Sequence, residues 1–191
     1  VKEAFHPTPI RRRVMEALFK LKMQLSRLDR TAQKMQQRDS VLHNKCVTAV
    51  QQKNTQLAAM YASECAEIRK MAKVVLQSQL ALEQVSLRLE TVLHYGDVAQ
   101  AMKPVANVVH TIRTQLEGLL PDVSMELASV NESLEYLVMA VGEATEQSFD
   151  VSVSGDDAQR ILSEASIVAE QKMRERFPEL PQVPMQEARV Q

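Results

Sequence analysis

Residues 10–95 read IRRRVMEALFKLKMQLSRLDRTAQKMQQRDSVLHNKCVTAVQQKNTQLAAMYASECAEIRKMAKVVLQSQLALEQVSLRLETVLHY. This stretch contains none of the four glycines and none of the seven prolines of the 191-residue chain. Glycine and proline are the residues least compatible with a helix interior, and they are the strongest local signals for a turn. Their absence over so many positions predicts long helices.

Two parts of this stretch carry apolar residues at alternating spacings of four and three, which is the pattern of a heptad seam. The first seam contains Val14, Leu18, Leu21, Leu25, Leu28, Ala32, Met35, Leu42, Cys46 and Ala49, with Asp39 as a polar exception. The second seam contains Tyr61, Cys65, Ile68, Ala72, Val75, Leu82, Leu89 and Leu93, with Gln79 and Ser86 as polar exceptions. Lys53, Asn54 and Thr55 separate the seams, and either Asn54 or Thr55 can cap the second helix.

The predicted fold class is all-α, a long antiparallel helical hairpin with shorter helices packed on it. Two apolar stripes that are joined by a short connection bury each other when the chain folds back. The composition agrees, because 45% of the residues are hydrophobic and only 4% are aromatic, which suits a thin helix-on-helix core. Each arm would be about 60 Å long at a rise of about 1.5 Å per residue.

Cys46 and Cys65 occupy seam positions on the two predicted arms. Folding the chain at Asn54 would bring them near the same level of the hairpin. We interpret them as small, reduced core residues, which is the usual state of cysteine in a cytosolic protein. A redox-sensitive disulfide between them is the alternative interpretation.

The pair Gly96 and Asp97 interrupts the second arm, and the helical pattern resumes directly after it. We interpret this pair as a bend or a hinge. The third predicted helix contains Pro104, which we expect in its first turn or at a kink, because an interior proline costs about 3 kcal/mol. A fourth amphipathic helix is predicted from about Pro121 to Gly142.

The C-terminal part is predicted to be a linker, a short helix and a tail. Residues 143–157 combine acidic residues with serine and glycine, and Asp156 or Asp157 can cap a last helix over residues 158–176. Three prolines at every third position within residues 177–184 favour an extended segment that a groove can capture, and a disordered tail is the alternative. The predicted organisation is a helical core over residues 1–142, an acidic linker over 143–157, and a C-terminal helix with a partner-binding tail over 158–191.

The net charge of −1 conceals a strong asymmetry along the chain. Residues 1–53 contain twelve basic and four acidic residues, a net charge of +8, and residues 54–120 contain six of each. Residues 121–191 contain five basic and fourteen acidic residues, a net charge of −9. At 100° per residue, eight basic residues of the first arm fall within about a third of the helix circumference, roughly opposite the seam. They are Arg12, Arg13, Lys20, Arg27, Arg30, Lys34, Arg38 and Lys45.

This basic stripe has three interpretations: a solvated face answered by the acidic C-terminal third, a nucleic-acid surface, and a surface for anionic membrane. No aromatic residues interleave with the stripe and no nucleic-acid-reading motif is present, so we expect no nucleic-acid partner. A Lys or Arg close to an anionic membrane contributes about 1 kcal/mol, so eight on one face would suffice for peripheral binding. Phe5, Ile10 and Phe19 would add a modest apolar insertion.

The stretch EIRKMAKVVLQSQLALEQVSLRLETVLHY, residues 67–95, is followed by GDVAQAMKPVANVV, and it resembles the core of ESCRT-III proteins, in particular their archaeal cell-division branch. The resemblance extends over about residues 9–142. Its other features are the basic first helix, the turn after AVQQKN, and the acidic C-terminal region. It implies a subunit that is held closed by its C-terminal region, opens by straightening the second and third helices into one, and polymerises on membranes to constrict or sever membrane necks.

The resemblance also implies roles for three groups of residues. The membrane-binding residues of the first helix would be Arg11, Arg12, Arg13, Lys20, Lys22, Arg27, Arg30 and Lys34. Gly96 and Asp97 would form the hinge at which the second and third helices merge. The tail residues Leu180, Pro181, Val183 and Pro184 would bind the MIT domain of the AAA ATPase that disassembles the polymer. The family's helical MIT-binding motif is not recognisable in residues 158–176, which leaves partner docking and autoinhibition as alternatives for the last helix.

We therefore predict a non-enzymatic, membrane-remodelling subunit that assembles with itself and with paralogous ESCRT-III subunits in archaeal cell division. The four histidines lack metal-ligand spacing and no glycine-rich phosphate loop is present, so no cofactor is expected. No run of about 18 uncharged apolar residues occurs, which predicts a cytoplasmic protein. The resemblance implies that it is peripheral on the inner face of the cell membrane at the division site. A non-polymerising coiled-coil scaffold or adaptor is the alternative function.

Overall fold

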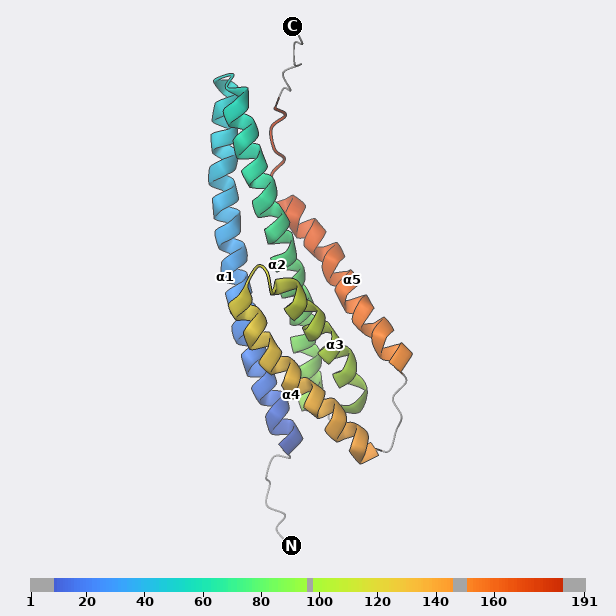
Figure 1. Ribbon diagram of the computed structural model, residues 1–191. Helices are drawn as coiled ribbons and strands as arrows, with labels where there is room; N and C mark the ends of the chain where they lie inside the picture. Colours follow the sequence, from blue (N-terminus) through green and yellow to red (C-terminus); the bar gives the residue numbers. More distant parts are fainter. Residues whose placement is uncertain (1–8, 96–97, 146–150, 184–191) are drawn as a thin grey trace.

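The computed structural model describes residues 9–95, 98–145 and 151–183. These residues form five helices and no strand: α1 Pro9–Gln51, α2 Thr55–Tyr95, α3 Val98–Leu116, α4 Pro121–Thr145 and α5 Val151–Arg176. The predicted all-α class is confirmed. α1 and α2 form the long antiparallel hairpin, α3 and α4 pack against its open end, and α5 runs back along α2 towards the hairpin tip (Figure 1).

A tight turn joins the two arms of the hairpin. The amide of Lys53 donates to the carbonyl oxygen of Val50 at 3.0 Å, and the amide of Asn54 donates to that of Ala49 at 2.9 Å. This pair of bonds is a common helix ending, with Lys53 in the left-handed region at φ 59°. The side-chain oxygen of Asn54 then accepts a hydrogen bond from the amide of Leu57 at 3.1 Å. Asn54 therefore caps α2, as one of the two predicted candidates.

One hydrophobic core draws on all five helices. Its fully buried large side chains include Leu21 and Leu28 of α1, Leu82 and Leu89 of α2, Ile112 and Leu116 of α3, Leu127 and Leu134 of α4, and Ile161 of α5. Each such side chain contributes about 1.5–3 kcal/mol relative to an exposed one. A second, smaller cluster at the hairpin tip contains Cys46, Ala49 and Ala58. The C-terminal helix thus shares the core of the hairpin.

α3 folds back beside α2 instead of continuing it (Figure 1). Pro104 is the seventh residue of α3 and lies inside the helix, so the predicted first-turn position is wrong. Proline has no amide hydrogen, so α3 lacks the bond that residue 104 would donate to the carbonyl oxygen of residue 100. Because Pro104 is itself buried, its packing helps to offset that loss.

The acidic segment 143–157, predicted to be a linker, is helical at both of its ends. α4 continues to Thr145, and α5 begins at Val151. Asp156 and Asp157, predicted as caps, lie inside α5, where a carboxylate oxygen of Asp157 pairs with Arg160 at 2.7 Å. Gly155 suggested a linker, but a glycine inside a helix costs only about 0.5–1 kcal/mol, and the docking of α5 on the core offsets this.

Candidate functional site

The predicted membrane-binding residues lie along the N-terminal two thirds of α1. Seven of the eight are exposed, and one is half-buried: the exposed residues are Arg11, Arg12, Arg13, Lys22, Arg27, Arg30 and Lys34, and the half-buried residue is Lys20. α5 packs on α2 and α3 and lies on the far side of the molecule from α1 (Figure 1). The C-terminal helix therefore leaves this basic surface uncovered.

The ion pairs of these cations agree with the separation of α5 from the basic surface of α1. Arg12 pairs with Glu16 of the same helix at 3.0 Å, and Lys22 pairs with Glu90 of α2 at 2.5 Å. Among the described residues, none of the eight cations forms an ion pair with residues 121–191. The interpretation in which the acidic third neutralises the stripe therefore finds no support in ion pairs within the described part of the chain.

α4 covers one edge of the basic surface through contacts that are not ion pairs. The guanidinium carbon of Arg13 lies 3.8 Å from the centroid of the Tyr136 ring, a cation–π contact. The ammonium group of Lys20 donates a hydrogen bond to the hydroxyl of Ser129 at 2.8 Å. Both contacts keep the positive charge, so α4 orients these two side chains without neutralising them.

Three further cations line a surface groove where α4 begins. Arg27, Arg30 and Lys34 face the first turn of α4, and the groove has a volume of about 420 Å³. Asp122 is the only carboxylate in its lining, and it forms no ion pair with another described residue. This end of the stripe therefore combines three positive charges with one negative charge in a recess, which favours an anionic ligand.

The predicted hinge residues Gly96 and Asp97 lie outside the described residues. The helices on either side of them, α2 and α3, pack against each other through the common core. In this arrangement α2 and α3 are two separate helices, as a folded-back state of the subunit requires.

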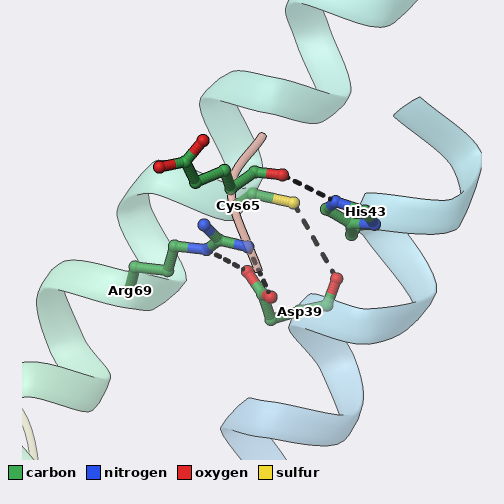
Figure 2. Close-up of polar contacts among 5 residues, drawn as sticks. Asp39, His43, Cys65 and Arg69 are labelled. Atoms are coloured by element: carbon green, nitrogen blue, oxygen red, sulfur yellow. Dashed lines mark hydrogen bonds and ion pairs between the residues drawn. The ribbon is translucent and has the colours of Figure 1, made fainter. Parts of the chain in front are cut away.

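A polar cluster around the buried Asp39 lies between the two arms, where the tail passes over the hairpin (Figure 2). Asp39 of α1 pairs with Arg69 of α2. The guanidinium carbon of Arg69 lies 5.7 Å from the centroid of the Phe177 ring, just after α5, and the ring is buried. The Nε2 atom of His43 lies 3.0 Å from the carbonyl oxygen of Glu179. The cluster therefore links both arms to the start of the tail.

The tail continues from this cluster along the hairpin. Leu180, Pro181 and Val183 are half-buried, and Val183 packs on the small cluster at the hairpin tip. Pro184 lies outside the described residues. Residues 177–183 form neither helix nor strand, and the surface that receives them here belongs to the same chain. His43 and Arg69 were missed as contacts of the tail because 136 positions separate His43 from Glu179 and no local pattern joins them.

The two cysteines are free and buried, as predicted. The thiol of Cys46 donates to the carbonyl oxygen of Ala58 at 3.4 Å, and that of Cys65 donates to the carbonyl oxygen of Asp39 at 3.9 Å. Asp39 and Cys46 are seven residues apart on α1, so the thiols lie about 10 Å apart along the hairpin. The expectation that they share one level is therefore wrong, because the chain folds about residue 52 and not about Asn54.

Burial raises the pKa of the Cys46 thiol. Burial and, to a smaller extent, the negative charge of Asp39 raise the pKa of Cys65 from 9.0 to about 11. Thiolate is the reactive form of cysteine, so both side chains are poor nucleophiles in the folded protein.

Searches for two other kinds of site give negative results within the described ranges. No group of three or more His, Cys, Asp or Glu side chains there is placed to hold a metal ion. None of the described helices combines the length and the apolar character that a bilayer crossing requires.

Comparison with known proteins gives consistent matches over most of the chain. The profile of the Snf7 family matches residues 16–188. Cell division protein B1 of Sulfolobus acidocaldarius is 43% identical over 173 residues, which cover 91% of this chain and 81% of the relative. Cell division protein B of the same organism is 33% identical over 171 residues, covering 90% of this chain and 66% of the relative. Cell division protein B3 is 23% identical over 167 residues, covering 87% of this chain and 96% of the relative. No solved structure gives a significant match.

Proposed function

Because the chain belongs to the Snf7 (ESCRT-III) family, we propose that it is a subunit of a membrane-remodelling polymer that acts in archaeal cell division. The names of the relatives support the cellular process. The observation that carries the membrane part is the exposed basic surface of α1, whose cations form no ion pair with a described residue of positions 121–191. Each cation near an anionic membrane adds about 1 kcal/mol, so seven exposed ones support peripheral binding at the inner face of the cell membrane.

Assembly proceeds, in this proposal, from the folded-back subunit to an extended one. α2 and α3 straighten into one helix, and Gly96 and Asp97 act as the hinge between them. The extended hairpins then stack with copies of themselves and with paralogous subunits, constricting the membrane to which they are bound. Three relatives from one organism, all named as cell division proteins, support the presence of such paralogues.

Disassembly depends on the tail. Leu180, Pro181, Val183 and Pro184 bind the MIT domain of an AAA ATPase, which supplies the energy for turnover. The subunit itself has a mechanical role and no catalytic one. The half-burial of Leu180, Pro181 and Val183 supports a further step, in which the tail leaves the hairpin before the ATPase binds.

Vesicle sedimentation tests the proposal on the full chain. We expect the protein to pellet with anionic vesicles and not with neutral ones, and electron microscopy to show filaments, rings or tubes on the vesicles. Raising the salt concentration should weaken the binding, because the Debye length falls from about 10 Å at 0.1 M to about 3 Å at 1 M. The variant Arg27→Glu/Arg30→Glu should lose most of the binding.

The matched control is Lys172→Glu/Arg174→Glu on α5, which changes the net charge equally on the other side of the molecule. It should bind vesicles like the unmodified chain. If the chain remains in the supernatant with both kinds of vesicle and forms no filaments, the alternative of a non-polymerising scaffold or adaptor replaces the polymer proposal.

A further inference from the structure

A row of exposed apolar side chains lies on α1 among the cations. Met15, Phe19 and Met23 follow one another at intervals of four residues, and 53%, 66% and 47% of their surfaces are exposed. Positions with this spacing lie on one side of a helix. Single exposed apolar residues are common on protein surfaces, but three in a row on one helix face form a patch. We call these three residues the apolar ridge.

The packing of the other helices leaves the ridge open. α1 contributes other residues to the hairpin core, among them Val14, Ala17 and Leu21, which are almost completely buried. α2 packs on that side, and α4 contacts α1 through Arg13 and Lys20. The ridge residues belong to neither contact surface, so the fold of the described chain does not account for their apolar character.

Positive charge surrounds the ridge. Arg12, Lys22 and Arg30 are exposed within about three turns of Phe19. Two carboxylates lie among them on α1: Glu16 is paired with Arg12 at 3.0 Å, and Asp29 accepts hydrogen bonds from Gln33 and Gln79. Lys22 is paired with Glu90 of α2, and Arg30 forms no ion pair with another described residue. The face therefore presents an apolar strip with a cationic border, which is the pattern of a helix that lies in the interface of an anionic membrane.

We propose that Met15, Phe19 and Met23 insert into the acyl boundary of an anionic membrane while the surrounding cations bind its headgroups. This inference rests on the proposed function and adds the mode of binding, namely insertion of side chains instead of adsorption by charge alone. A second copy of the same face is a poorer occupant, because it would bring two cationic borders together. Of the other residues predicted from the sequence to insert, Ile10 is half-buried against the core and Phe5 lies outside the described residues.

The sequence offers a direct probe, because the chain contains no tryptophan. The variant Phe19→Trp places a single indole at the centre of the ridge. With vesicles that contain anionic lipid, its emission should shift to shorter wavelength, and lipids brominated in the acyl chains should quench it. The matched control is Ile167→Trp, because α5 lies away from α1 (Figure 1) and Ile167 is 69% exposed. Its emission should neither shift nor be quenched.

A second measurement separates insertion from charge. Phe19→Ser retains every cation. Loss of the phenyl ring that inserts into the membrane should weaken partitioning into anionic vesicles about tenfold. The residual binding should be abolished at a salt concentration at which the unmodified chain still binds, because apolar insertion is not screened by ions. Ile167→Ser should change neither property.

The outcomes distinguish failure of the inference from failure of the proposed function. If the variants pellet with anionic vesicles but the emission of the Phe19→Trp variant is neither shifted nor quenched, the cations bind without insertion; the inference is then wrong and the proposed function stands. If no variant and not even the unmodified chain binds vesicles, both are overturned. An emission shift that appears without vesicles and grows with protein concentration would assign the ridge to a contact between copies, which also overturns the inference.

Discussion

The carboxylate of Asp39 accepts two hydrogen bonds from the guanidinium group of Arg69, one from Nε at 2.7 Å and one from Nη2 at 2.9 Å (Figure 2). Only 2% of the Asp39 side chain and 17% of the Arg69 side chain are exposed. Asp39 is the polar exception in the first heptad seam. Because a shift of one arm along the other would leave both charges buried and unpaired, this pair fixes the register of the hairpin.

Replacing one partner of this pair should strongly destabilise the fold. Asp39→Ala leaves the charge of Arg69 without compensation, and we expect the free energy of unfolding to fall by about 3–5 kcal/mol in urea denaturation. The double variant Asp39→Leu/Arg69→Met removes both charges and should recover most of that loss. Glu67→Ala breaks the exposed pair with Lys70, also 2.7 Å long, and should cost less than about 1 kcal/mol. Equal losses for Asp39→Ala and Glu67→Ala would contradict the role of the buried pair.

The raised pKa of Cys65 predicts slow reaction with thiol reagents. With a pKa of about 11 instead of 9.0, the thiolate fraction at pH 8 is about a hundredfold lower than in the unfolded chain. Labelling of the native protein with iodoacetamide, followed by mass spectrometry, should therefore be at least that much slower than labelling in urea. Rapid native labelling of Cys65 would show that the arms separate locally.

The same raised pKa predicts that the stability of the folded chain decreases at alkaline pH. The folded chain keeps the Cys65 proton up to about pH 11, whereas the unfolded chain releases it near pH 9. This contribution of Cys65 to stability is complete below pH 9 and is lost as the pH rises through 11. Urea midpoints measured across this range should fall less steeply for Cys65→Ala than for the unmodified chain. Parallel curves for the two proteins would contradict the assignment.

The contact between Phe177 and Arg69 predicts competition between the hairpin and the ATPase for the tail. Phe177→Ala removes a buried ring and its cation–π contact, so the tail should leave the hairpin more often. A partner that binds only the free tail gains affinity in proportion to the population of that state. Isothermal titration with an isolated MIT domain should show a several-fold lower Kd. Gln182→Ala, an exposed position of the tail, is the control for a change of sequence without release. An unchanged Kd for Phe177→Ala would mean that the hairpin does not compete.

The sequence predicts the hairpin well because heptad spacing and helix capping are local signals. The seams place Leu21, Leu28, Leu82 and Leu89 in the core, and the polar break limits the cap of α2 to Asn54 or Thr55, of which Asn54 is the cap. The exposure of α1 follows from the same periodicity, because residues opposite a seam face solvent. These parts of the fold depend on residues that are close together in the chain.

The remaining features depend on contacts between distant segments. Gly155 and the surrounding serines and acidic residues favour a linker, yet α5 includes them because Ala158 and Ile161 dock on the core. No local sequence pattern identifies Arg69 as the partner of Asp39, and no local pattern places the tail on the hairpin. The exposure of Met15 and Met23 differs from these contacts, because their spacing of four from Phe19 and their position outside the seam predict it from the sequence.

The proposed hinge gives a last prediction, which separates folding from assembly. Position 97 directly precedes Val98, the first residue of α3. A proline is tolerated at position 97 while α3 begins there, because the amides at the start of a helix have no partner within the helix. In one continuous helix through α2 and α3, a proline at position 97 would be interior, where it removes a hydrogen bond and collides with the preceding turn at a cost of about 3 kcal/mol. Asp97→Pro should therefore keep the circular dichroism and the urea midpoint of the unmodified chain, bind anionic vesicles through α1, and form few or no filaments by electron microscopy. Asp97→Ala is the control, because alanine favours helix in both states and should leave assembly intact or increased. Filaments of normal number and shape from Asp97→Pro would mean that α2 and α3 assemble without merging.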